Sequence, residues 1–126
     1  HSIVGNFLEH ARIFYFENGG SPEVYMGSAD WMPRNLDKRV EIMFPVEDPA
    51  LKEQVIHILK VQLADNVKAH ILQPDGTYEK IDKRGKVLVT AQEQFCEEAV
   101  AMAKAATARD DVHNTRVFVP SEGQGL

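Results

Sequence analysis

The sequence has little cysteine, no long hydrophobic run and no excess of positive charge. Its 126 residues contain one cysteine, Cys96, which cannot form an internal disulfide and has no cysteine or histidine neighbour at metal-binding spacing. No apolar run approaches the roughly 20 residues that span a bilayer. Nothing at the start resembles a signal peptide. We therefore expect a reducing compartment and no membrane span.

The net charge argues against one class of partner. At −5, the formal charge has the opposite sign to that of general nucleic-acid and membrane-surface binders, which are usually basic. A site for a polyanion would have to be local and formed by converging arginines and lysines. The most basic segment, residues 80–86, is either a solvated loop or a patch that guides an anionic chain.

The length of the chain predicts one domain that buries a core of its own, but not a multidomain enzyme. The sequence opens at His1 without a methionine and in the middle of a pattern. We therefore expect a fragment of a longer protein.

Residues 7–35 form the densest part of the sequence. They open with an apolar run, residues 7–16, that only Glu9, His10 and Arg12 interrupt. Side chains alternate between the two faces of a strand, so His10 and Arg12 would project from one face, about 7 Å apart. Because both faces are otherwise largely apolar, the pattern predicts a central strand that is covered on both sides.

His10 and Arg12 would both need polar partners in such a strand. A neutral imidazole can attack or deprotonate, and a neighbouring guanidinium offers a planar fork that grips phosphoryl oxygens. The pair therefore fits a phosphate site. It also fits a structural explanation, in which a buried carboxylate binds His10 and the Arg12 side chain extends to the strand end.

A turn and a second strand follow. The sequence Asn-Gly-Gly-Ser-Pro at residues 18–22 predicts a turn, because glycine readily adopts positive φ and proline cannot continue a ladder. Residues 24–28 then fit a short strand that ends at Gly27 and Ser28. Small residues at a strand end let backbone N–H groups and a hydroxyl approach a ligand.

The rest of the chain predicts further helices and strands. Pro33 interrupts any strand, so residues 31–39 are expected to form a structured loop. On the strand expected after it, Arg39 and Glu41 share a face, where Arg39 either pairs with Glu41 or turns toward the site. An N-capping aspartate followed by proline predicts the start of one helix, and a capping box predicts the start of another. The expected elements are a strand at 39–46, a helix from Pro49, a hairpin with strands at 67–72 and 77–81, and a helix from Ala91.

Two blocks of the sequence are highly specific. The segments FLEHARIFYFENGG and GSADWMPRNLDKRVEIMFPVEDP closely resemble the C-terminal part of bacterial polyphosphate kinase. The resemblance implies an α/β fold, with a mixed β-sheet flanked by helices, of the phospholipase D-like type. We expect this domain to cover residues 1–108. Residues 109–126 are expected to form a loosely ordered tail in which only 117–119 docks.

The resemblance also assigns roles to individual residues. His10 matches the family's second active-site histidine and is the candidate catalytic residue. The candidates for binding phosphate or ATP are Arg12, Ser28, Arg34 and Arg39. Arg12 replaces the lysine of the phospholipase D superfamily, and Asn6 stands where many relatives have a basic residue, which affects only a secondary anion contact. No residue of this chain is assigned to a metal.

The resemblance implies that the terminal phosphate of ATP is transferred to inorganic polyphosphate through a phosphohistidine in a preceding domain. ATP and Mg²⁺ would then be required, with the metal held mainly by the rest of the enzyme, and this fragment would be inactive alone. The implied partners are polyphosphate and the remaining domains of the same enzyme, in a homo-oligomer and without nucleic acid. The implied location is the cytoplasm, with membrane association of the full-length enzyme as an alternative.

Two other functions remain open at this point. One is a phospholipase D-like phosphodiesterase or nuclease half-site with His10 as nucleophile. The missing lysine and the absence of an asparagine shortly after Gly-Ser weigh against it. The other is a non-catalytic anion-binding or assembly module, in which the glycine-rich turn and Trp31 shape an interface.

Overall fold

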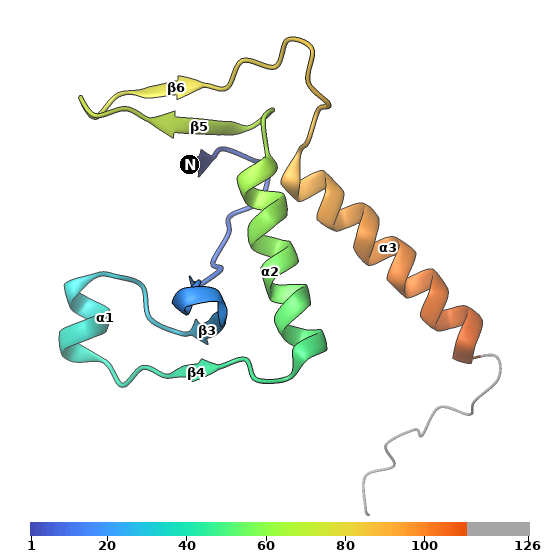
Figure 1. Ribbon diagram of the computed structural model, residues 1–126, viewed down its shortest axis with the longest axis horizontal. Coiled ribbons are helices and arrows are strands. Elements are labelled where there is room, and N and C mark those ends of the chain that lie inside the picture. The colour runs from blue at the N-terminus through green and yellow to red at the C-terminus, as the bar shows by residue number, and fades with distance from the viewer. Residues whose placement is uncertain (111–126) are drawn as a thin grey trace, which may run out of the picture. The chain divides into compact units, whose positions relative to one another are not determined.

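The computed structural model describes residues 1–110, which form two compact units (Figure 1). The first unit, His1–Gln92, contains the described strands, the first two α-helices and the start of the third. The second unit begins at Glu93 and contains the rest of that helix. The strands are β1 (Ser2–Ile3), β2 (Ile13–Phe16), β3 (Glu23–Gly27), β4 (Met43–Pro45), β5 (Ala69–Leu72) and β6 (Tyr78–Lys80). The helices are the 3₁₀ turn η1 (Asn18–Gly20), α1 (Pro33–Lys38), α2 (Pro49–Ala64) and α3 (Ala91–Asp110).

The strands of the first unit form two three-stranded sheets, in the orders β2-β3-β4 and β1-β5-β6. Every described pairing is antiparallel, so the expected single mixed sheet is replaced by two antiparallel ones. Short connections explain two of the four pairings: residues 17–22 join β2 to β3 and residues 73–77 join β5 to β6. A parallel pair needs a crossover of a dozen or more residues.

The turn between β2 and β3 has the backbone that its sequence predicts. Asn18, Gly19 and Gly20 adopt φ values of 46°, 62° and 91°. Glycine reaches such angles without the Cβ clash that other residues meet. The strand after the turn, β3, ends at Gly27 as expected.

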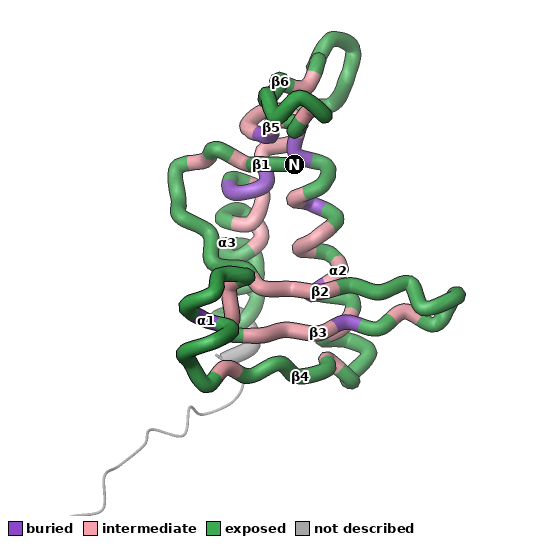
Figure 2. The backbone as a smooth tube through the Cα atoms, turned by 90° about the vertical axis from the view of Figure 1, so that its left-hand side faces the viewer, coloured by how far each residue is buried: buried purple, intermediate pink, exposed green. Residues whose placement is uncertain are grey.

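The predicted central strand at residues 7–16 is wrong in length and in position. Only Ile13–Phe16 is a strand, and it lies at the outer edge of its sheet, paired with β3 alone among the described strands. Residues 7–12 lack strand pairing, and His10 is exposed. The apolar run therefore does not mark a strand buried on both faces, because much of it is open to solvent (Figure 2).

Two further expectations need correction around Pro33. Residues 31–39 contain a helix, α1, with Pro33 in its first turn. The fixed φ of proline suits that position, where the missing N–H costs no helical hydrogen bond. The strand expected at residues 39–46 is shorter, Met43–Pro45, because Arg39 serves as the C-cap of α1.

Helix α2 begins as predicted and supplies part of the core. Asp48 caps its first turn, with its carboxylate accepting a hydrogen bond from the Leu51 N–H at 2.9 Å. Val55 and Val61 on α2 are buried, as is Val24 on β3. Contacts from α2 reach both β2 and β3. The helix thus anchors the sheet whose ends carry the candidate site.

Asp65 connects the end of α2 to β5 and to the start of α3. It is 1% exposed. Its Oδ1 accepts hydrogen bonds from the N–H groups of Val67, Lys68 and Ala69 at 2.8–3.1 Å, and its Oδ2 accepts one from Ala91 N–H at 2.8 Å. Burial by itself would raise the pKa of this carboxyl, but the four backbone donors outweigh it and hold the pKa below its ordinary value.

The predicted helix start at Ala91 is confirmed. Helix α3 continues through Asp110, and the rest of the expected tail, including residues 117–119, lies outside the described residues. None of the described helices is both long and apolar enough to cross a membrane.

Candidate active site

The candidate site is organised around an ion pair between Arg12 and Asp30. Arg12 Nε lies 2.7 Å from Asp30 Oδ1, and Arg12 Nη2 lies 2.9 Å from Asp30 Oδ2. Arg12 directly precedes β2 and Asp30 follows β3, and the Gly27 N–H donates to the Arg12 carbonyl at 3.1 Å. Because β2 and β3 are antiparallel neighbours, the start of one strand meets the end of the other.

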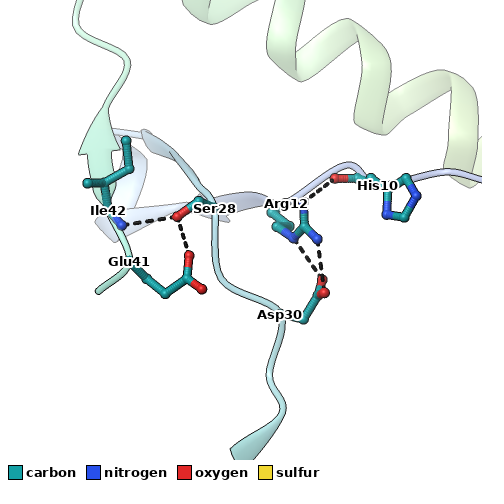
Figure 3. Close-up of polar contacts among 6 residues, drawn as sticks. All are labelled: His10, Arg12, Ser28, Asp30, Glu41 and Ile42. Atoms are coloured by element: carbon teal, nitrogen blue, oxygen red, sulfur yellow. Dashed lines mark hydrogen bonds and ion pairs between the residues drawn. The ribbon is translucent and has the colours of Figure 1, made fainter. Parts of the chain in front are cut away.

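His10 lies beside this pair. Its carbonyl oxygen accepts a hydrogen bond from Arg12 Nη1 at 3.3 Å, and its side chain is exposed. Figure 3 shows Arg12 between His10 on one side and Ser28 with Glu41 on the other. His10, Arg12 and Ser28 therefore lie near one end of the sheet that contains β2 and β3, although no hydrogen bond among the described residues joins Ser28 to the other two.

Asp30 is held in its anionic form. Its pKa lies below the ordinary value mainly because Arg12 donates hydrogen bonds to it. Partial burial acts in the opposite direction, while the charges of Arg12 and His10 and a hydrogen bond from Asn35 add to the lowering. Asn35, on α1, is 2% exposed, and its Oδ1 has no hydrogen-bond partner among the described residues.

Arg12 keeps part of its hydrogen-bonding capacity. A guanidinium carries five N–H donors. Asp30 takes two of them and the His10 carbonyl takes one, which leaves two without a partner among the described residues. The Arg12 side chain is 25% exposed, so a ligand can reach it. Two free donors on a fixed guanidinium suit the oxygens of a phosphoryl group.

The Ser28 hydroxyl is engaged within the protein. It accepts a hydrogen bond from the Ile42 N–H at 3.1 Å and donates one to Glu41 Oε2. The Ser28 N–H also donates to the Ile42 carbonyl at 3.0 Å. These bonds tie the end of β3 to the residues before β4. Phosphate binding by Ser28 stays a prediction, and it would require the hydroxyl to exchange Glu41 for a ligand.

Arg34 and Arg39 lie at the two ends of α1 and are exposed. Within the described residues, no hydrogen bond or ion pair joins either arginine to His10 or Arg12. The alternative pairing of Arg39 with Glu41 is not formed in this part of the chain either, because Glu41 binds Ser28. Their roles at the phosphate site remain predictions.

A small cavity of about 240 Å³ adjoins the ion pair. It is lined by Ala11, Arg12, Ile13, Phe14, Ala29, Asp30 and Trp31. Trp31 is 81% exposed, and its ring centroid lies 6.2 Å from that of Phe14. A larger groove of about 820 Å³ has mainly apolar walls that include Phe7, Leu8 and Leu63, and neither His10 nor Arg12 lines it. The smaller cavity therefore contains the Arg12–Asp30 ion pair, and His10 lines neither of the two hollows.

The described residues do not fit a magnesium site. No group of three or more histidine, cysteine, aspartate or glutamate side chains among them could hold a metal ion. The carboxylate of Asp30 is already neutralised by Arg12. Magnesium prefers several oxygen ligands with little competition from cations, so any such ion would be held from elsewhere.

Sequence reasoning missed Asp30 and Asn35. Asp30 lies in the same GSADWMPRN block that carries Ser28 and Arg34. The structural explanation of the His10 and Arg12 pair requires a buried carboxylate. This requirement is a signal that could have led to Asp30. The carboxylate exists, but it binds Arg12 rather than His10 and is only partly buried.

Comparison with known proteins points to the same family as the sequence blocks that carry these residues. Residues 1–92 match the family model described as polyphosphate kinase C-terminal domain 2. The chain is 47% identical over 121 residues to a polyphosphate kinase of Lactiplantibacillus plantarum, which covers 95% of this chain and 17% of that protein. It is 61% identical over 77 residues to a polyphosphate kinase of Thermosynechococcus vestitus, covering 61% of this chain and 10% of that protein.

A solved structure gives the same result at the level of fold. The crystal structure of polyphosphate kinase from Porphyromonas gingivalis superposes with a TM-score of 0.74 at 38% sequence identity, covering 82% of this chain and 16% of that one. This confirms the expected α/β, phospholipase D-like fold class. The chain spans about a sixth or less of the length of these relatives. It belongs to the polyphosphate kinase family, as C-terminal domain 2.

Proposed function

We propose that this domain forms the His10 side of the active site in a polyphosphate kinase that transfers the terminal phosphate of ATP to inorganic polyphosphate. The phosphoryl group would pass through a phosphohistidine in another domain. The observation that carries the proposal is the Arg12 guanidinium, which Asp30 fixes next to His10 while two of its N–H donors have no partner in the described part of the chain. Family membership supplies the reaction to which this arrangement is suited.

His10 and Arg12 would divide the chemistry between them. An exposed imidazole can take up or release a proton near neutral pH. In phosphoryl transfer, charge spreads over the equatorial oxygens, and positioned cationic donors stabilise it. Arg12 would bind these oxygens through its free N–H groups, with Asp30 fixing the plane of the guanidinium.

Further positive charge is needed at the site, because Asp30 balances the charge of Arg12. Arg34 and Arg39 are exposed at the ends of α1, close in sequence to Asp30, and we assign them to the phosphates of ATP or polyphosphate. Ser28 would add a hydroxyl contact after release from Glu41. Mg²⁺, which other parts of the enzyme would hold, would supply further neutralisation of phosphate charge.

The proposal includes partners outside this chain. The remaining domains of the same enzyme would pack against its surface, where large apolar side chains such as Phe7, Leu8 and Val40 are exposed. We also propose a homo-oligomeric enzyme in the cytoplasm and no activity of this domain alone.

The test compares two histidine variants of the full-length enzyme. His10→Gln removes the titrating ring, and His57→Gln makes the same change at an exposed position on α2. We expect His10→Gln to lower the rate of ATP-dependent polyphosphate synthesis by about 10²-fold or more, the usual scale of acid–base catalysis. The His57 variant should keep the wild-type rate.

A wild-type rate of synthesis in His10→Gln would refute the proposed role. A phosphodiester-hydrolysis assay on the same proteins distinguishes the phospholipase D-like alternative from the proposed kinase function. That alternative predicts hydrolysis by the wild type and its loss in His10→Gln, with no polyphosphate made by either.

A further inference from the structure

The side chain of Gln92 binds the backbone just before His10. It is 8% exposed and stands in the first turn of α3, as the last residue of the first unit. Its Oε1 accepts from the N–H groups of Asn6 at 2.8 Å and Phe7 at 3.0 Å. Its Nε2 donates to the Phe7 carbonyl and to Glu9 Oε1, both at 2.8 Å. These four bonds use the full capacity of a side-chain amide.

Glu9, the residue next to His10, is held from two directions. Gln92 binds its Oε1, and Gln62 on α2 donates from Nε2 to its Oε2 at 2.8 Å. The carboxylate therefore joins α2, the start of α3 and the segment before His10. The two glutamines lie 53 and 83 residues from Glu9 in sequence, so the network depends on the folded chain.

Within the described part of the chain, no backbone–backbone hydrogen bond holds residues 5–9. Among the described residues, the Val4 N–H donates to the Lys68 carbonyl, and the next backbone–backbone bond along the chain is the one accepted by Arg12. At Gly5, a Cβ would lie 2.1 Å from Gln92 Oε1, so another residue would displace the glutamine. The conformation of residues 5–9 thus depends on the amide of Gln92.

We propose that Gln92 and Glu9 are positioning residues for His10, which set the backbone from Asn6 to Glu9 and thereby direct the imidazole into the phosphate site. This proposal rests on the proposed function of His10. Its physical basis is that a reacting group must be held close to its productive geometry, and a displacement of about 1 Å can cost a hundredfold in rate.

The test uses Gln92→Glu in the full-length enzyme. The shape of the side chain and both of its accepted bonds are kept. The new carboxylate oxygen, however, faces the Phe7 carbonyl and the Glu9 carboxylate, where Nε2 donates in the wild type. We expect kcat for polyphosphate synthesis to fall about tenfold or more, with KM for ATP changed less than about threefold, because the defect lies in the reacting geometry.

Hydrogen exchange gives a readout that does not depend on catalysis. The amides of Asn6 and Phe7 should exchange about tenfold faster in Gln92→Glu, because the variant loses both donated bonds and the segment opens more easily even though its accepted bonds can form. Gln94→Glu is the matched control, since Gln94 binds Glu98 within the same helix, at 2.8 Å. It should change neither kcat nor exchange in this segment.

Two more variants separate positioning from simple loss of stability. Val61→Ala removes buried methyl groups from α2 without touching the network and should lower the melting temperature while kcat is kept. Adding Glu9→Gln to Gln92→Glu restores a donor opposite the new carboxylate, but not the bond to the Phe7 carbonyl. The double variant should therefore recover part of kcat.

The outcomes are distinct. Lower kcat with faster exchange, partly recovered by the double variant, supports positioning. Unchanged kcat with faster exchange would mean that the network only stabilises the structure and does not position His10. Unchanged kcat and unchanged exchange would overturn the proposal entirely. If His10→Gln itself keeps the wild-type rate, the proposed function fails and the positioning role fails with it, whatever the exchange data show.

Discussion

Asp30 and Asp65 are both aspartates whose pKa lies below its ordinary value, but their partners differ in kind. Asp65 is 1% exposed and binds four backbone N–H groups, which belong to two separate parts of the first unit. Asp30 has a side-chain exposure of 37% and binds the side chain of Arg12. Backbone groups hold one carboxylate, and a side chain holds the other.

The difference indicates what each aspartate does. A buried charge satisfied by backbone donors cannot exchange them without local unfolding, so Asp65 serves stability. A partly exposed ion pair contributes little to stability, since water and salt screen it. The Arg12–Asp30 pair is therefore better explained by the orientation it gives to Arg12 beside His10.

The largest effect is expected at Asp65. Replacing it by asparagine places an NH₂ group against backbone N–H groups and leaves buried donors unpaired. Asp65→Asn should lower the free energy of unfolding by about 3 kcal/mol. Denaturant unfolding of the full-length enzyme, monitored for this domain by hydrogen exchange, checks the value. An unchanged free energy of unfolding would mean that Asp65 contributes no more to stability than an exposed carboxylate does.

The pH dependence of stability should follow from the same residue. The folded-state pKa of Asp65 lies below the unfolded value, so its contribution is complete above about pH 4 and is lost as the pH falls through the folded pKa. The difference in unfolding free energy between wild type and Asp65→Asn should stay constant from pH 7 to about pH 5 and shrink below about pH 4. A difference in unfolding free energy that grows as the pH falls would contradict this assignment.

Arg12→Lys should affect rate rather than stability. Lysine keeps the charge but loses the planar fork, so it cannot hold Asp30 through two bonds and still present ordered donors to a phosphate. We expect the rate of polyphosphate synthesis to fall by about tenfold or more, with no resolvable change in melting temperature. A full rate with lysine would mean that charge alone matters at this position.

The smallest effect is expected at a third aspartate, Asp82. It pairs with Arg84 at 2.7 Å, but both side chains are mostly exposed, at 60% and 91%. Asp82→Asn should leave both the rate of synthesis and the melting temperature unchanged, because such surface pairs are screened. A lower KM for polyphosphate would favour the other interpretation of the basic segment 80–86, as a guide for the polyphosphate chain, because the variant makes this segment more positive.

The parts of this molecule that could be predicted from sequence depend on local signals. The turn at residues 18–20 follows from glycine, and the start of α2 follows from Asp48 and Pro49. The apolar run at residues 7–16 indicates a buried strand, but most of it is not one, because hydrophobicity alone does not reveal whether other parts of the chain cover a segment. Pro33 interrupts a strand, but proline also suits the first turn of a helix, and the local sequence does not distinguish the two.

The candidate site could be predicted only in part for a related reason. His10 and Arg12 are two residues apart, so their proximity can be inferred from the sequence. Asp30 lies 18 residues from Arg12, and Gln92 lies 85 residues from Phe7. Such contacts exist only once β2, β3 and the start of α3 are in place, and no local pattern specifies them.

The most direct test of the central claim is the rate of ATP-dependent polyphosphate synthesis by Asp30→Asn in the full-length enzyme, with the melting temperature measured on the same sample. If the Arg12–Asp30 pair orients Arg12 for the reaction, the rate should fall about tenfold or more, while the melting temperature stays at the wild-type value. A wild-type rate, or a fall in melting temperature as large as that of Asp65→Asn, would contradict the account.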